Sequence, residues 1–315
     1  MRIAMIGTGY VGLVSGACLA DFGHHVVCID KDGAKLRALW RGEIPIFEPG
    51  LEELVRKNVS EGRLSFSIEL QENVRSADAI FIAVGTPSRR EDGHADLSYI
   101  YDVAREIAAS VNGFAVVVAK STVPVGTCDE IQRIIRQERP QADVAVVSNP
   151  EFLREGAGIR DFKFPDRIVV GCDDERAKKI LAEVYRPLSL NQVPMFYTSC
   201  RNAELIKYAA NAFLATKITF INELADLCEK VGADIQEVAR GIGLDNRIGA
   251  KFLHAGPGFG GSCFPKDVRA LIKTGQDHDV QLRILEAVAA LNDNRAGNGA
   301  QKSPPDTRRA PQNLN

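Results

Sequence analysis

Short apolar runs alternate with longer amphipathic segments through the first two thirds of the chain. The apolar runs predict buried strands at residues 2–6, 26–29, 79–84, 114–119, 144–147, 167–171 and 192–197. Helical patterns occupy residues 13–22, 97–109, 125–138 and 173–186. Because strand, crossover helix and strand follow one another in this rhythm, we predict an α/β fold with a doubly wound parallel sheet at residues 1–198.

The pattern changes at about residue 200. Residues 200–231 contain no proline and no glycine, and their apolar positions cover more than one helical face. Such a surface predicts either the axis of the molecule or a subunit interface, and we expect a homodimer through this helix. Further helical patterns at residues 265–275 and 280–292 complete a small helical domain at residues 199–295. The polar, proline-bearing residues 296–315 predict a disordered tail.

Composition excludes several classes of protein. The net charge of −2 over 315 residues gives no reason to expect nucleic acid or an acidic membrane surface as a partner. The seven cysteines contain no Cys-x-x-Cys pair, which argues against a disulfide framework and against a zinc site. We therefore predict no metal and a reducing, cytoplasmic location. No apolar run is long enough to span a bilayer.

A glycine motif follows the first predicted strand. Gly7, Gly9 and Gly12 have the spacing Gly-x-Gly-x-x-Gly, and the second strand ends in Asp30, eighteen residues beyond Gly12. The glycines permit a tight turn and a close approach of pyrophosphate, while the acid can accept hydrogen bonds from ribose hydroxyls. This context predicts a Rossmann-like site for NAD. Asp30 would repel the 2′-phosphate of NADP.

Polar residues stand where three further strands end. Thr86, Thr122 and Glu151 fall at the carboxyl ends of their strands, where ligands bind in such sheets, although each could equally be a helix cap or a turn residue. On the long helix, Lys207 and Asn211 are four residues apart and project from the same face. We predict that Lys207 is a site lysine rather than a solvated one.

Residues 256–267, Gly-Pro-Gly-Phe-Gly-Gly-Ser-Cys-Phe-Pro-Lys-Asp, carry the strongest candidate chemistry. Pro265 suits the first turn of a helix, which places Cys263 just before a helix start. A helix N-terminus and a neighbouring lysine both stabilise a thiolate, the form of cysteine that attacks a carbonyl carbon. We predict that Cys263 is a nucleophile rather than a buried structural cysteine.

Taken together, these motifs resemble those of the nucleotide-sugar dehydrogenases. The matching segments are residues 7–12, 46–51, 85–87, 120–126, 149–156, 207–211 and 258–267, in order through about residue 295. Phe264 after the cysteine is similar to the UDP-glucose branch of the family. The resemblance implies NAD-dependent oxidation of UDP-glucose to UDP-glucuronate, through a thiohemiacetal and then a thioester on Cys263.

The resemblance also implies roles for individual residues. Lys207 and Asn211 would stabilise an oxyanion, while Asp267, Thr122 and Glu151 would position or deprotonate water. The implied substrate contacts are Glu151, Phe152, Leu153, Glu155, Lys207, Asn211, Arg247, Phe252, Gly256, Gly258, Phe259 and Gly260. The implied cofactor contacts are Gly7, Gly9, Tyr10, Val11, Gly12, Asp30, Lys35, Thr86, Thr122, Glu155 and Lys266.

One departure and three alternatives accompany this interpretation. Members of the family continue into a further nucleotide-binding domain, and we expect that the tail at residues 296–315 reflects a truncation or a shifted reading frame. The substrate could instead be GDP-mannose or UDP-N-acetylmannosamine. The 3-hydroxy-acid and 6-phosphogluconate dehydrogenases share a Rossmann domain and a long helix with lysine and asparagine, but they need no nucleophilic cysteine. A truncated chain could also bind NAD without turnover.

Overall fold

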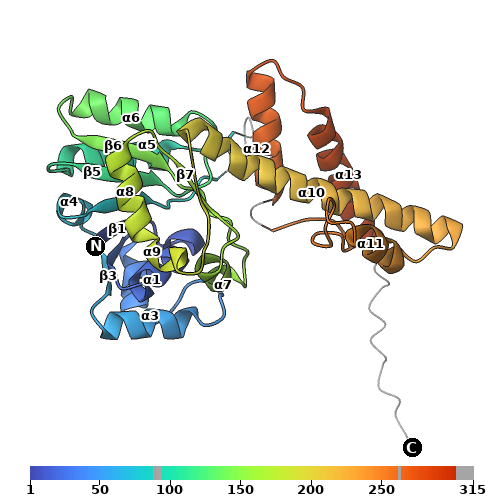
Figure 1. Ribbon diagram of the computed structural model, residues 1–315, viewed down its shortest axis with the longest axis horizontal. Coiled ribbons are helices and arrows are strands. Elements are labelled where there is room, and N and C mark those ends of the chain that lie inside the picture. The colour runs from blue at the N-terminus through green and yellow to red at the C-terminus, as the bar shows by residue number, and fades with distance from the viewer. Residues whose placement is uncertain (88, 90–93, 262–263, 303–315) are drawn as a thin grey trace, which may run out of the picture. The chain divides into compact units, whose positions relative to one another are not determined.

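The computed structural model describes residues 1–87, 89, 94–261 and 264–302. The chain forms two compact units, one of Met1–Tyr208 and one that begins at Ala209 (Figure 1). The division falls inside the long helix α10 (Cys200–Val231), whereas the sequence pattern placed it before this helix.

An eight-stranded sheet organises the first unit, in the order β3-β2-β1-β4-β5-β6-β7-β8. Its strands are β1 (Arg2–Ile6), β2 (His25–Ile29), β3 (Leu64–Ser67), β4 (Ala79–Ile82), β5 (Ala115–Ala119), β6 (Val144–Ser148), β7 (Ile168–Gly171) and β8 (Met195–Thr198). From β3 through β6 every neighbouring pair is parallel, which confirms the doubly wound sheet. One edge of the sheet departs from the parallel arrangement. There β7 meets β6 in an antiparallel bridge, although β7 and β8 are parallel to each other. The reason is that residues 149–167 hold only the short helix α7 (Gly158–Lys163), so the chain turns back without a full crossover helix.

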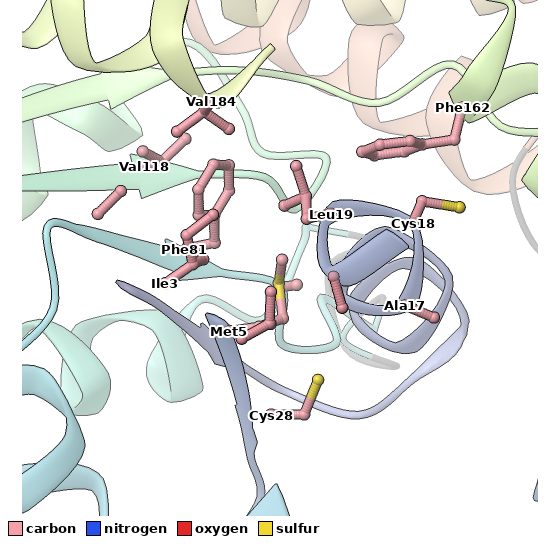
Figure 2. Packing of buried hydrophobic residues seen from close by; sticks show 14 of the residues in the cluster. Ile3, Met5, Ala17, Cys18, Leu19, Cys28, Phe81, Val118, Phe162 and Val184 are labelled. Atoms are coloured by element: carbon pink, nitrogen blue, oxygen red, sulfur yellow. The ribbon is translucent and has the colours of Figure 1, made fainter. Parts of the chain in front are cut away.

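Helices pack on both faces of this sheet, because successive side chains of a strand point to opposite sides. The remaining helices of the first unit are α1 (Tyr10–Asp21), α2 (Gly33–Trp40), α3 (Leu51–Ser60), α4 (Leu70–Arg75), α5 (Ser98–Ser110), α6 (Thr127–Glu138), α8 (Glu175–Val184) and α9 (Arg186–Ser189). Met5 and Phe81 belong to the cluster that includes Leu19 of α1 and Val184 of α8 (Figure 2). Their strand neighbours face the opposite cluster, with α4, α5 and α6. Burial on both faces explains why the strands appear in the sequence as continuous apolar runs.

Four elements between residues 33 and 75 have no counterpart among the predicted ones: α2, α3, β3 and α4. They are short, and few of their side chains are buried. In β3, for example, only Leu64 and Phe66 are buried, and serines alternate with them. The predicted helix at residues 173–186 is instead divided into α8 and α9, because Pro187 lies in the first turn of α9 and cannot continue an existing helix.

The second unit contains most of α10 together with α11 (Ile235–Gly243), α12 (Phe264–Asp277) and α13 (Arg283–Lys302). A small core of Ala215, Phe259, Val268 and Val288 joins α10, α12 and α13. Helix α13 extends into the segment that was predicted as a tail from residue 296, because the first proline of that segment is Pro304. Residues 303–315 lie outside the described part of the chain. Within the described part, no helix is both long enough and apolar enough to cross a bilayer.

Candidate active site

The glycine motif forms a tight turn between β1 and α1. Gly7 has a φ of +104°, a conformation that side chains rarely adopt, and a Cβ on Gly12 would lie 2.0 Å from the carbonyl oxygen of Gly7. Helix α1 begins at Tyr10, three residues earlier than predicted. The N–H groups of its first turn have no partner within the helix and are available to a ligand at the glycine turn. A cavity of about 530 Å³ opens here. Among the predicted cofactor residues, it is lined by Gly7, Gly9, Asp30 and Lys35.

Asp30 presents a carboxylate to this cavity. It accepts hydrogen bonds from Thr8, at 2.9 Å from the backbone nitrogen and 2.6 Å from Oγ1, and Lys35 Nζ lies 3.2 Å away. Burial raises the pKa of Asp30, but the hydrogen bonds from Thr8 and from the Asp32 N–H, with the charge of Lys35, outweigh burial and hold the pKa below its ordinary value. An ionised acceptor in this place suits ribose hydroxyls and disfavours a 2′-phosphate.

Tyr10, a predicted cofactor residue, has two hydrogen-bond partners within the protein. Its hydroxyl lies 2.6 Å from Glu48 Oε2 and 2.8 Å from the Arg154 carbonyl oxygen. The buried Glu48 carboxylate also accepts hydrogen bonds from the N–H groups of Gly156, at 2.9 Å, and Ile159. Glu48 therefore ties the glycine turn to the segment after β6. Sequence reasoning assigned Glu48 no role, although it lies in one of the segments that carry the family resemblance.

The remaining predicted cofactor residues are distributed over the chain. Thr86 and Thr122 are brought together after β4 and β5, where Thr86 Oγ1 donates to the Thr122 carbonyl oxygen at 3.0 Å. Val11 packs against the hydrophobic cluster that contains Met5, Leu19 and Phe81, and Glu155 is exposed. Lys266 belongs to the second unit.

Two predicted catalytic residues of the first unit form a buried ion pair. Lys207 Nζ lies 3.3 Å from Glu151 Oε1, and the side chains are only 4% and 5% exposed. Glu151 Oε2 also accepts the Leu153 N–H, which closes the turn after β6. The ring of Phe152 contacts Lys207 Nζ, 5.3 Å from its centroid, and the Arg167 guanidinium, 3.8 Å from it. Lys207 is therefore a buried residue, not a solvated one, and it is placed at the carboxyl edge of the sheet.

A second buried lysine, Lys120, was not predicted as a site residue. Its Nζ lies 3.1 Å from Asn149 Oδ1 and 3.2 Å from the Tyr185 hydroxyl. The pKa of Lys120 is lowered to about 8, mainly by burial; the charge of Glu151 opposes this shift, and the charge of Lys207 adds to it. The signal in the sequence is a lysine that directly ends an apolar strand.

In the second unit, two of the predicted catalytic residues, Asn211 and Asp267, are in direct contact. Asn211 Nδ2 donates to Asp267 Oδ2 at 2.6 Å, and Lys266 Nζ lies 3.0 Å from Asp267 Oδ1. Asp267 is 1% exposed. Cys263, the predicted nucleophile, lies outside the described residues, and the described chain resumes at Phe264, the first residue of α12.

Buried polar side chains hold the glycine-rich segment before α12. Asn292 Oδ1 accepts the Phe259 N–H at 2.7 Å, and its Nδ2 donates to the Phe259 carbonyl oxygen at 3.0 Å. Asn222 Oδ1 accepts the Gly256 N–H at 2.7 Å. Neither asparagine was predicted, and the only signal is a polar residue on a mainly apolar helical face.

The other predicted substrate residues of the second unit differ in their surroundings. Gly258 has a φ of +120°, and a side chain on Gly260 would meet open space. Phe252 packs against Phe264, with ring centroids 6.2 Å apart. The side chain of Arg247 is 89% exposed and pairs with Asp245, so the structure does not gather it with the buried groups. The described residues contain no group of three or more His, Cys, Asp or Glu side chains that could hold a metal ion.

Two successive parts of the chain match domains of one known protein family. Residues 1–189 match the NAD binding domain of the UDP-glucose/GDP-mannose dehydrogenase family, and residues 201–294 match the central domain of the same family. The chain is 69% identical to the UDP-glucose 6-dehydrogenase of Rhizobium meliloti (strain 1021), over 94% of this chain and 68% of that protein. It is 52% identical to the UDP-glucose 6-dehydrogenase YwqF of Bacillus subtilis (strain 168), over 94% of this chain and 66% of the relative.

A solved structure shares the fold as well. The UDP-glucose dehydrogenase from the archaeon Pyrobaculum islandicum superposes with a TM-score of 0.88 at 43% identity, over 93% of this chain and 68% of that one. The chain thus spans about two thirds of the length of these relatives. Both halves of the described chain match in order, and the chain belongs to the UDP-glucose/GDP-mannose dehydrogenase family.

Proposed function

We propose that the protein catalyses the NAD-dependent, two-step oxidation of UDP-glucose to UDP-glucuronate. The observation that carries this proposal is the high identity to a relative named UDP-glucose 6-dehydrogenase, over nearly all of this chain. The geometry adds support, because a dinucleotide turn and a buried lysine with a carboxylate partner lie at the same carboxyl edge of one sheet.

The residues of the glycine turn fit NAD. The 2.0 Å approach at Gly12 leaves no room for a side chain, the N–H groups that begin α1 can bind pyrophosphate, and Asp30 can accept hydrogen bonds from ribose hydroxyls. When bound, NAD accepts the hydride that the sugar carbon loses in each oxidation.

The chemistry of the sugar carbon is assigned to the following side chains. The Cys263 thiolate adds to the carbonyl carbon of the aldehyde, so a C–S bond forms and the C=O π pair becomes an alkoxide. The ammonium of Lys207 and the amide of Asn211 stabilise that negative oxygen. After the second oxidation, water attacks the thioester carbon and the C–S bond breaks, which releases the thiolate. Glu151, Thr122 and Asp267 position this water or accept its proton.

The exposed face of α10 supports a homodimer. Phe213, Phe220 and Leu227 recur at intervals of seven residues, and their side chains are 66%, 51% and 55% exposed. Large apolar side chains at this spacing form the seam between two packed helices. We further propose a cytoplasmic location, where the thiolate of a catalytic cysteine stays reduced.

The test is an assay of the purified protein with NAD and, separately, UDP-glucose, GDP-mannose and UDP-N-acetylmannosamine. We expect two NADH and one UDP-glucuronate per UDP-glucose. Cys263→Ala should abolish formation of the acid, while Cys172→Ala, a change at a buried cysteine beyond β7, should retain it. Full turnover by Cys263→Ala would favour the 3-hydroxy-acid type of chemistry. NAD binding without NADH formation from any of the three sugars would favour a binding protein.

A further inference from the structure

Apart from the candidate active site, two cysteine thiols meet where two helices begin. Cys128 lies in the first turn of α6, and Cys200 is the first residue of α10. Cys200 packs against the apolar cluster that contains Cys128, and each thiol shifts the pKa of the other. Both are free cysteines. The proposed oxidation of UDP-glucose uses neither of them.

Glu204 fixes the two helix starts in relation to each other. It lies one turn after Cys200 on α10 and is 2% exposed. Its carboxylate accepts the N–H of Gly126 at 2.7 Å and the N–H of Cys128 at 2.8 Å. Because this hydrogen-bonded clamp needs no covalent link, the thiols are held together in the reduced protein.

The two thiols differ in accessibility and in acidity. Cys128 is 2% exposed, whereas Cys200 is half-buried. The interaction with Cys128 lowers the pKa of Cys200, although burial of Cys200 opposes the shift. The interaction with Cys200, burial and the charge of Glu204 all raise the pKa of Cys128. Cys200 is therefore the group that reacts first, and Cys128 is placed to resolve the product.

We propose that Cys128 and Cys200 form a peroxide-sensitive dithiol that closes to a reversible disulfide. The Cys200 thiolate attacks one oxygen of hydrogen peroxide, which gives Cys200 sulfenic acid and hydroxide. The sulfur of Cys128 then attacks the sulfenic sulfur, an S–S bond forms, and water leaves with the proton of the Cys128 thiol. Peroxide is reduced by two electrons, and the two thiols are oxidised by two.

The bond would join the starts of α6 and α10 covalently. Lys207 lies seven residues beyond Cys200 on α10, so oxidation acts on the helix that presents this lysine. Cross-linking residues 128 and 200 also closes a long loop, which constrains the unfolded chain. We expect that oxidation raises the midpoint of thermal unfolding of the first unit.

The experiment is peptide mapping of the whole protein after treatment with hydrogen peroxide, alkylation of the remaining thiols and digestion with trypsin. Cys128, Cys172 and Cys200 fall on separate tryptic peptides, at residues 121–133, 168–176 and 180–201. We expect a cross-link between the first and the third, lost on treatment with dithiothreitol. Cys172→Ser should retain this cross-link. In Cys128→Ser, Cys200 should instead be trapped by dimedone as a sulfenic acid.

Two results would overturn the proposal. The first is a cross-link between the peptides 168–176 and 180–201, which would show that Cys172, next to the Gly171 carbonyl that Cys200 contacts at 3.1 Å, is the true partner. The second is full alkylation of both Cys128 and Cys200 after peroxide treatment followed by denaturation. Neither readout depends on dehydrogenase activity, and the wild-type chain alone can decide between them.

Discussion

Lys207 Nζ lies 3.3 Å from Glu151 Oε1, and water reaches almost none of either side chain. Lys207 comes from α10, whereas Glu151 follows β6, so the pair joins the long helix to the carboxyl edge of the sheet. Desolvation of two charges costs about as much as their attraction returns, so stability alone gives little reason for such a pair. The proposed oxidation of UDP-glucose gives both groups a chemical role.

Lys207→Met should be strongly destabilising. The substitution leaves the Glu151 carboxylate buried without its cation, and breaking a buried pair in this way costs about 3–5 kcal/mol. The measurement is urea denaturation followed by circular dichroism. Adding Glu151→Leu to the variant should recover part of the loss, because the uncompensated charge is then removed as well.

The matched control is Lys178→Met, since Lys178 pairs with Glu175, whose side chain is 75% exposed. This control should leave the urea midpoint nearly unchanged, because an exposed pair contributes little. If Lys207→Met and Lys178→Met lost the same stability, burial of the Lys207–Glu151 pair would not be the cause of the loss.

Because Lys120 is buried, we expect the free energy of unfolding to change at alkaline pH. Burial lowers the pKa of Lys120 to about 8 from an ordinary value of 10.5, so the folded protein loses this proton before the unfolded chain does. Between these values the unfolded chain binds more protons, and stability therefore rises with pH. Relative to Lys120→Met, the wild-type protein should gain roughly 3 kcal/mol as the pH increases from 8 to 10.5.

The readout is the difference between the unfolding free energies of the two proteins at each pH, in which other titrating groups cancel. Tyr185, which contacts Lys120, does not interfere because burial raises its pKa above this window. Parallel curves for the two proteins would show that Lys120 titrates normally.

The sequence was sufficient for those parts of the fold that long apolar runs encode. The strands of the central sheet are buried on both faces, so β1 after Arg2, β4 and β5 appear as continuous apolar runs. Short elements with few buried side chains, such as α2 and β3, carry no comparable signal. The antiparallel edge at β7 depends on how one connection turns back, and that is a tertiary property.

Some residues of the candidate site could be predicted from the sequence, and others could not. Asp30, Lys207 and Asp267 stand at characteristic positions beside strand ends or in motifs, and they could be chosen from the sequence. Glu48 and Asn292 could not, because each acts on backbone groups more than thirty residues away in the chain. Hydrogen bonds of this kind depend on the folded arrangement and leave no local pattern.

Asp30→Ala should weaken NAD binding by about 10- to 100-fold, the effect of losing hydrogen bonds to a charged acceptor. Binding of NADP should weaken less, because the repulsion of its 2′-phosphate is removed at the same time. Isothermal titration calorimetry with both dinucleotides measures this selectivity. Asp32→Ala is the control, since Asp32 caps α2 through Ala34 and Lys35, and it should alter stability but not selectivity. An equal loss of affinity for NAD and NADP would show that Asp30 does not contact the ribose.

Asn292→Ala should loosen the glycine-rich segment without unfolding the second unit. The Phe259 N–H and carbonyl oxygen would both lose their partner, at a cost of about 1–3 kcal/mol, so the amide of Phe259 should exchange roughly 10- to 100-fold faster. Hydrogen exchange followed by mass spectrometry measures this rate, and the Gly256 amide, bonded to Asn222, is an internal reference. Asn294→Ala, at an exposed position on the same helix, should change neither amide. The Gly256 amide reports on the same glycine-rich segment, and Asn294 lies on the same helix as Asn292. Faster exchange at Phe259 alone would therefore show that the contact with Asn292 protects this amide, and unchanged exchange would refute that role.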